Sequence, residues 1–253
     1  MNSLRDIEDY QRAYEASDFE PVQARMRKRM LLALLARWRP ARVLEVGCGN
    51  DALFRHHDAF ERFCVVEPGQ AFAAMAREQA GSDARIRVVQ AFMEDAAERL
   101  ADERFDCILL SGLLHEVPDC HRFLAAVAAL CGPATRVHVN VPNARSLHRL
   151  LALEMGLIGG LHELSANQRS LQQPRTFDID SLSALCSDNG FKVTESGSYF
   201  VKPFTHRQMA QLQDIGLMDE RMLDGLYGLE RHLPGLGSEI YVNLQRVPST
   251  KEA

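Results

Sequence analysis

The sequence lacks the features of a membrane-bound, disulfide-stapled or zinc-ribbon protein. None of its six cysteines forms a CxxC pair, and no HxxxH pattern or cluster of Asp and His suggests a metal site. The polar N-terminus has no apolar signal core, and the longest apolar run, residues 30–36, is far shorter than a membrane span. We therefore expect a cytoplasmic protein with reduced, structural cysteines, no metal and no membrane contact.

The sequence also lacks the basic excess of a nucleic-acid-binding protein. Its formal net charge is -5, and the one dense basic run, Arg25, Arg27, Lys28 and Arg29, is interpreted as the polar face of a single helix. No nucleic-acid partner is expected. The pattern leaves open whether the protein is a monomer or a homodimer.

Short apolar segments alternate with helical patterns through the first two thirds of the chain. This alternation is typical of an α/β fold with a doubly wound, mostly parallel sheet. The predicted strands are residues 42–46, 63–66, 86–89, 105–110, 135–141, 191–200 and 239–246, and the predicted helices include 70–79, 95–100, 119–130 and 180–189.

Four segments follow from this pattern. Residues 1–39 are predicted to be an N-terminal helical segment, and 40–142 the α/β core that binds a nucleoside cofactor. Residues 143–180 are predicted to form a helical lid insertion. Residues 181–253 would complete the core with two final strands, separated by a helical excursion.

A glycine turn follows the first predicted strand. Gly47 and Gly49 leave the backbone bare where a ligand can approach, and we expect a helix after them whose N-terminus would favour an anion. Glu67 ends the next predicted strand, 20 residues after Gly47, where a carboxylate can accept hydrogen bonds from both ribose hydroxyls. Because both loops of a doubly wound fold open onto one crevice, they predict a nucleoside site.

The glycine turn fits two classes of cofactor, and the negative charge of Glu45 distinguishes between them. The segment from Gly47 to Ala52 also meets the relaxed dinucleotide pattern of an NAD-dependent dehydrogenase. Glu45, two residues before the first glycine, would repel a pyrophosphate. It would suit the cationic amino group and sulfonium of S-adenosylmethionine (SAM). SAM is therefore the preferred cofactor, with its methionine carboxylate as the anion at the turn.

Several motifs together resemble class I SAM-dependent methyltransferases. They are VLEVGCGN, VVEPG, FDCILLSGLLHEV, VHVNVPN and SEIYVNLQRV, which cover residues 40–142 and the final two strands. The resemblance is closest to the group that methylates sugars, quinones and other small metabolites. One departure is Asp51, which stands where many members have a further glycine.

The resemblance implies a Rossmann-like sheet of seven strands with an antiparallel last strand, and S-adenosylhomocysteine as the product. It assigns the methionine part of SAM to Glu45, Gly47, Cys48 and Gly49, the ribose to Glu67 and Pro68, the adenine edge to Ala91, Phe92 and Met93, and the floor near the sulfonium to Ser111 and Gly112.

Methyl transfer to a hydroxyl or amine needs a group that takes a proton. His115, which follows the fourth predicted strand, is the first candidate base, and His148 is the second. The segment after the fifth strand, together with a later loop, is predicted to bind an acceptor, through Asn143, Arg145, Arg149 and His206. Arg145 and Arg149, four residues apart, would share a helix face able to hold a phosphate or carboxylate.

These observations predict an enzyme that methylates an oxygen or nitrogen of a small metabolite. The preferred acceptor is a sugar, including a phosphorylated or nucleotide-linked one. An RNA or protein methyltransferase and a non-catalytic SAM-binding module are the alternatives, and the NAD-dependent dehydrogenase is kept as a fourth reading.

Overall fold

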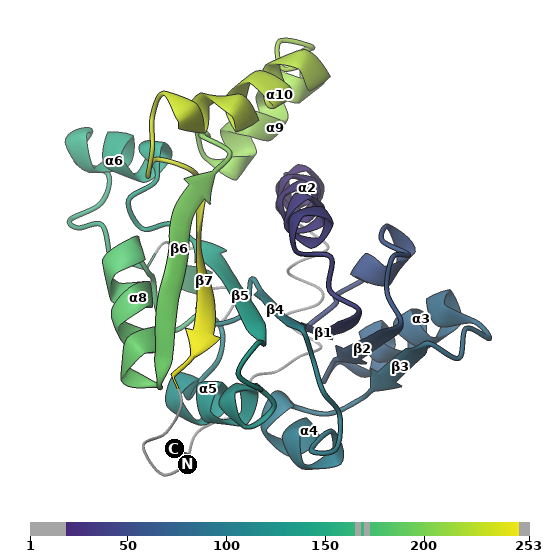
Figure 1. The fold of residues 1–253 in the computed structure, drawn as a ribbon. Helices are drawn as coiled ribbons and strands as arrows, with labels where there is room; N and C mark the ends of the chain where they lie inside the picture. The colour runs from purple at the N-terminus through teal and green to yellow at the C-terminus, as the bar shows by residue number, and fades with distance from the viewer. Residues whose placement is uncertain (1–18, 165–167, 170–172, 248–253) are drawn as a thin grey trace.

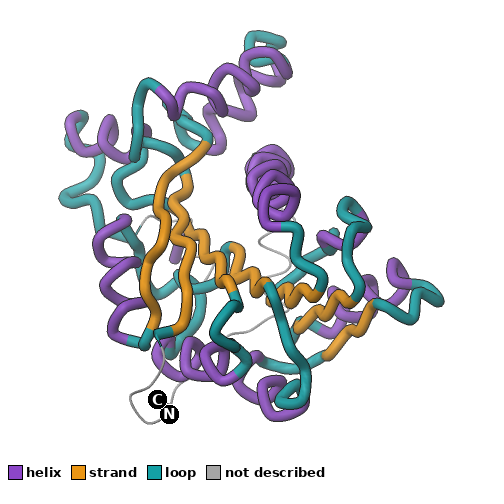
Figure 2. The backbone as a smooth tube through the Cα atoms, viewed as in Figure 1, coloured by secondary structure: helices purple, strands orange, loops and turns teal. Residues whose placement is uncertain are grey.

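The computed structural model describes residues 19–164, 168–169 and 173–247. These residues form one seven-stranded sheet in the order β3-β2-β1-β4-β5-β7-β6 (Figures 1 and 2). The strands are β1 (Arg42–Val46), β2 (Arg62–Val66), β3 (Ile86–Val89), β4 (Cys107–Ser111), β5 (Arg136–Pro142), β6 (Phe191–Tyr199) and β7 (Glu239–Arg246). Strands β1 to β5 pair in parallel, whereas β7 is antiparallel to both β5 and β6. The predicted fold class is confirmed.

Helices flank the sheet on both faces (Figure 1). They are α2 (Glu20–Trp38), α3 (Gln70–Ala80), α4 (Met93–Arg99), α5 (Cys120–Ala129), α6 (Leu147–Glu154), α8 (Ile179–Asp188), α9 (His206–Asp214) and α10 (Glu220–Gly228), with short 3₁₀ helices η1 (Leu53–Arg55) and η2 (Leu229–Arg231). Polar N-caps fix several starts, because a side-chain oxygen satisfies a free N–H of the first turn. Asp119, for example, accepts from Arg122 N at 3.0 Å, at the start of α5.

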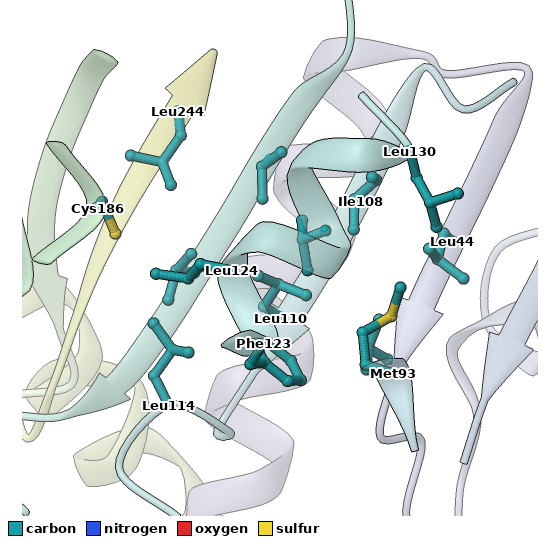
Figure 3. Close-up of a cluster of buried hydrophobic side chains, with 14 of the residues drawn as sticks. Leu44, Met93, Ile108, Leu110, Leu114, Phe123, Leu124, Leu130, Cys186 and Leu244 are labelled. Atoms are coloured by element: carbon teal, nitrogen blue, oxygen red, sulfur yellow. The ribbon is translucent and has the colours of Figure 1, made fainter. Parts of the chain in front are cut away.

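Alternation along the strands produces two apolar layers. Leu44, Val46 and Leu110 pack against α4, α5 and α8, and Figure 3 shows part of this cluster, with Met93 and Leu124. Val43, Val65 and Leu109 face the other way, against α2, η1 and α3, and the same layer continues to α9 and α10. Glu45 lies on this second face, since it alternates with Leu44 and Val46. This face also carries the buried polar residues His138, Asn140 and Asn243, whose neighbours along β5 and β7 belong to the first layer.

The end of β1 differs from the sequence-based prediction. No α-helix follows Gly47 and Gly49, because only the three-residue 3₁₀ helix η1 forms before β2. The prediction of a helix N-terminus at this turn is therefore wrong. In the loop that replaces it, the Asp51 carboxylate pairs with Lys28 of α2 and with its sequence neighbours Arg55 and His56.

The remaining predicted segments lie close to the observed ones. Helix α2 covers the second half of the predicted N-terminal helical segment, and residues 1–18 lie outside the described residues. Within 143–180 the chain forms α6 and the first residues of α8, and the predicted lid role of this segment stays a prediction. All six cysteines are buried and unpaired. No helix of the described chain is long and apolar enough to cross a membrane.

Candidate active site

A cavity of about 900 Å³ lies between α2 and the carboxyl ends of β1, β2 and β4. Parallel strands present their ends at one edge of the sheet, and ligands of doubly wound folds bind there. The cavity brings together most of the residues predicted for the cofactor: Glu45, Gly47, Cys48, Gly49, Glu67, Pro68, Phe92, Ser111 and Gly112. Met93 is instead buried in the core and Ala91 packs against it, so neither lines the cavity.

Gly47 and Gly49 have different roles in the turn. Gly47 has φ +73°, and a Cβ there would lie 2.7 Å from Leu113 Cδ2, so the fold itself requires this glycine. Gly49 has φ +57°, and a Cβ there would meet no protein atom within 4 Å. The space beside Gly49 is therefore open to the cavity, as a bare backbone site for a ligand requires.

The carboxylate of Glu67 is held by backbone N–H groups of the loops that follow β1 and β2. Its carboxylate accepts from Gly69 N at 2.8 Å and from Gly49 N at 3.3 Å, and the residue is 5% exposed. Burial raises the pKa of Glu67, and the backbone donors oppose that shift. The carboxylate therefore stands fixed at the junction of β1 and β2, where the ribose was predicted.

Glu45 is the second buried acid of the cavity. It accepts from Leu53 N at 3.0 Å, which connects the end of β1 to η1. Burial raises its pKa to about 8, and the nearby charge of Glu67 adds to the shift, while the Leu53 hydrogen bond and Lys28 oppose it. A cation in the cavity would favour the ionised form of both acids.

Helix α2 closes the cavity from above through its basic run. Arg27 binds Glu239 of β7 at 2.5 Å, and Lys28 pairs with Asp51 of the glycine loop. The two neighbouring arginines pair with acids of α10: Arg25 with Glu220 at 2.7 Å and Arg29 with Asp224 at 2.6 Å. The interpretation as a polar helix face is therefore incomplete, because the run ties α2 to three other parts of the fold.

Arg27 belongs to a buried polar network beside the cavity floor. Its guanidinium lies 3.7 Å from the position that a Cβ on Gly112 would take. Its partner Glu239 is 2% exposed, accepts from Asn140 Nδ2 at 2.8 Å and binds the Tyr199 hydroxyl. Although burial opposes ionisation, Arg27 lowers the pKa of Glu239 to about 2. The network fixes α2 across the ends of β5, β6 and β7.

His115 lies behind the cavity wall. It is 4% exposed, its Nε2 is 3.4 Å from Glu116 Oε1, and its Nδ1 has no hydrogen-bond partner. Glu116 lines the cavity, as does Ser111, whose buried hydroxyl is also without a partner. The predicted base thus reaches the cavity through Glu116.

The residues predicted to bind an acceptor lie outside the cavity and mostly in structural contacts. Asn143 donates to the carbonyls of Gly235 and Gly237 at 3.0 and 2.8 Å. Arg149 donates to the carbonyls of Leu161 and Glu163, both at 2.7 Å, and so braces the loop after α6. Arg145 is exposed.

His148 and His206 lie near one another, at the starts of α6 and α9. Burial lowers the pKa of His148, with Lys202 and His206 as further causes. Burial also lowers the pKa of His206 to about 3, with Lys202 as the next cause. Each ring has a buried Nδ1 without a hydrogen-bond partner.

Sequence reasoning missed the contribution of α2 to the cavity. Glu20, Arg27 and Lys28 line it, as does Phe72 of α3. In the sequence, only the basic run indicated that α2 has a role beyond packing. The ion pairs of this run with distant acids could not be deduced from residue spacing. Among the described residues, no group of three His, Cys, Asp or Glu could hold a metal ion.

A family profile described as a methyltransferase domain matches residues 16–196. No curated protein matches the chain. Among solved structures, a SAM-dependent methyltransferase from Thermotoga maritima is 16% identical, covers 95% of this chain and 96% of its own, and has a TM-score of 0.59. One from Mesorhizobium loti is 15% identical, with 92% and 99% coverage and a TM-score of 0.56. The N-methyltransferase NodS from Bradyrhizobium japonicum, solved with S-adenosylhomocysteine, is 11% identical, with 92% and 90% coverage and a TM-score of 0.52.

The cavity fits the cofactor of this family. The open space beside Gly49 suits an extended ligand, and two buried acids, Glu45 and Glu67, suit its positive charge. No helix N-terminus is present at the glycine turn to favour the methionine carboxylate of SAM. Arg27 and Lys28 are positively charged side chains that line the cavity. The profile match over most of the chain and this fold show the family: the chain belongs to the methyltransferase-domain family and is a class I SAM-dependent methyltransferase.

Proposed function

We propose that this enzyme transfers the methyl group of SAM to an oxygen or nitrogen of a small metabolite, with a sugar, including a phosphorylated or nucleotide-linked one, as the preferred acceptor. The observation that carries the proposal is the cavity itself. Its volume of about 900 Å³ lies at the upper end of the range of small-molecule sites, about 300–1,000 Å³. Residues of α2 line one side of it, opposite the strand ends.

Bound SAM supplies a methyl group already activated on a sulfonium. The chain then has to orient the acceptor behind that methyl group and keep water away. Glu67 and Phe92 are proposed to bind the nucleoside, while Gly49 and Glu45 face the methionine part with its positive charge. Alignment of this kind can contribute roughly 7–11 kcal/mol to lowering the barrier.

The proton of the acceptor is proposed to leave through the His115–Glu116 pair. Glu116 lines the cavity, and His115 Nε2 lies 3.4 Å from its carboxylate. A proton accepted at the cavity wall can thus be shared with an imidazole. His148, the second candidate base from the sequence, does not line the cavity, so His115 and Glu116 are preferred.

The charges of α2 argue against an RNA acceptor. All four basic residues of its run form ion pairs with acids of the same chain, so they are not a free stripe for phosphates. We therefore place the RNA or protein methyltransferase second.

Transfer from methyl-labelled SAM tests this proposal. The purified enzyme would be incubated with a small-molecule fraction, an RNA fraction and a protein fraction from the same cells. Label is expected in the small-molecule fraction alone. Label in RNA or protein would overturn the proposed acceptor class, and SAM-stabilised protein without any transfer would favour a non-catalytic module.

A further inference from the structure

A second group of polar side chains lies beyond α2, outside the cavity. It comprises Ser146 and His148 at the start of α6, Lys202 after β6, and His206 at the start of α9. Strands β5 and β6 end at the same edge of the sheet, because Pro142 and Tyr199 both pair with Glu239 of β7. The topology thus brings these segments together at the upper end of β6 in Figure 1. We call the four residues the basic cluster.

The contacts of Phe19 and the charges of the cluster place Lys202, His148 and His206 close to one another, and Ser146 is two residues before His148. The Phe19 ring lies 5.6 Å from the His206 ring and 6.0 Å from Lys202 Nζ. The charge of Lys202 also lowers the pKa of both His148 and His206, after burial as the larger cause.

Several polar atoms of the cluster have no hydrogen-bond partner. Ser146 is 0% exposed and its hydroxyl has no partner, and the Nδ1 atoms of His148 and His206 are buried without partners. Lys202 is 2% exposed, and in the described part of the chain no carboxylate forms an ion pair with it. Buried polar groups are normally satisfied, so several such groups together require an explanation.

An anion would satisfy all of these groups at once. Lysine and protonated imidazoles are donors without acceptor atoms, and a serine hydroxyl can donate as well. Burial lowers the pKa of Lys202 to about 7, and burial followed by the charge of Lys202 lowers the pKa of His206 to about 3, so positive charge is unfavourable in this place. A bound anion would stabilise positive charge on these side chains and so offset the unfavourable effect of burial. A phosphate, with several acceptor oxygens, matches the number of donors better than a carboxylate does.

The basic cluster lies next to the active site. Glu20 lines the cavity, pairs with Arg27 at 3.5 Å, and acts through its charge on Lys202. Arg27 in turn lies against Gly112 at the cavity floor. Glu20 therefore borders both the cavity and the basic cluster.

We propose that Lys202, His148, His206 and Ser146 bind a phosphate group of the methyl acceptor, which makes the acceptor a phosphorylated small molecule. This inference rests on the proposed function, since it assigns the phosphate to the substrate of the same active site. It differs from the sequence-based prediction for Arg145 and Arg149, because Arg149 is engaged with backbone carbonyls and Arg145 is exposed.

Binding of inorganic phosphate to the protein saturated with S-adenosylhomocysteine tests the site. Calorimetry would measure affinity, and NMR would follow the imidazole signals of His148 and His206. Lys202→Met should weaken phosphate binding roughly tenfold or more, since a charged hydrogen bond is lost. The control Lys192→Met removes an exposed lysine of β6 and should change nothing. Because Lys202→Met removes a buried charge and keeps the side-chain length, we expect it to fold.

The outcomes separate this inference from the proposed function. Phosphate binding that is equal in Lys202→Met and Lys192→Met, or absent in the wild type, would overturn the phosphate site. Preference for acetate over phosphate would overturn it too. Ser146→Ala, which should weaken phosphate binding without loss of folding, gives an independent check. Failure of SAM binding in the wild type would instead remove the proposed function, and the acceptor assignment with it.

Discussion

Gly49 offers a test of ligand contact at a single residue. Gly49→Ala places a Cβ in open space, so the folded protein is affected only through the backbone at φ +57°, at a cost of about 1–2 kcal/mol. SAM affinity should fall much further, because the methyl group enters the cavity. Calorimetric titration with SAM measures this loss.

Gly190→Ala is the matched control. Gly190 also has positive φ, +79°, and its Cβ would meet no atom within 4 Å, but it lies between α8 and β6, away from the cavity. We expect similar destabilisation and unchanged SAM affinity. Equal affinities for the two variants would show that Gly49 does not contact the cofactor.

Glu45 should couple SAM binding to pH. Burial raises its pKa to about 8, above the unfolded value of about 4.3, so the folded protein holds a proton that the unfolded chain has released. The stability that Glu45 contributes without ligand therefore falls as pH rises between these values. SAM, being cationic, favours the ionised form, so its affinity should rise over the same interval, by up to about tenfold per pH unit.

Comparison with Glu45→Gln isolates this effect, because the titration of SAM itself is common to both proteins. The variant should show a flatter dependence of affinity on pH. Parallel pH profiles for the two proteins would mean that the cationic part of SAM does not lie near Glu45.

The residues that line the active site were only partly predictable. Gly47, Gly49 and Glu67 could be assigned because strand ends in a doubly wound sheet meet at one crevice. Glu45 could be assigned because it is two residues before the first glycine and its charge suits a cationic ligand. Arg27 and Lys28 could not, since their partners Glu239 and Asp51 lie far away in sequence and only the folded chain brings them together.

At the scale of elements, the buried ion pair between Arg27 and Glu239 should contribute more to the stability of the protein than the exposed ion pairs of α2 do. Arg27→Met would leave Glu239 buried without its cation, which costs about 3–5 kcal/mol for a buried pair. We expect the lower end, because Asn140, Tyr199 and Gln23 still donate to Glu239. Urea denaturation measures the change in the free energy of unfolding.

Arg25→Met is the control on the same helix. Its pair with Glu220 is exposed, so removal should cost no more than about 1 kcal/mol. If both variants lost the same stability, the buried network would not be what fixes α2 to the sheet.

The elements themselves followed closely from patterns of hydrophobicity. All seven strands were predicted within a few residues, and Gly190 correctly marked the end of α8. The helix expected after Gly49 did not form. The pairing of Asp51 with Lys28 joins residues 23 positions apart, so no local pattern could reveal it, whereas Arg55 and His56 are close neighbours of Asp51 in the sequence.

At the scale of the whole molecule, the sheet is a rigid platform and α2 is its roof. Two apolar layers fix the strand ends, and ion pairs join α2 to β7, α10 and the glycine loop. We propose that the cofactor binds between the junction of β1 and β2 on one side and α2 on the other. This binding mode requires that adenosine lie between the two strand ends.

A crystal structure of the protein with S-adenosylhomocysteine tests this requirement most directly. The account predicts both ribose hydroxyls within hydrogen-bond distance of the Glu67 carboxylate, and the amino-acid end beside Gly49 and Glu45. Adenosine bound at another place, or Glu67 without contact to the ribose, would contradict it.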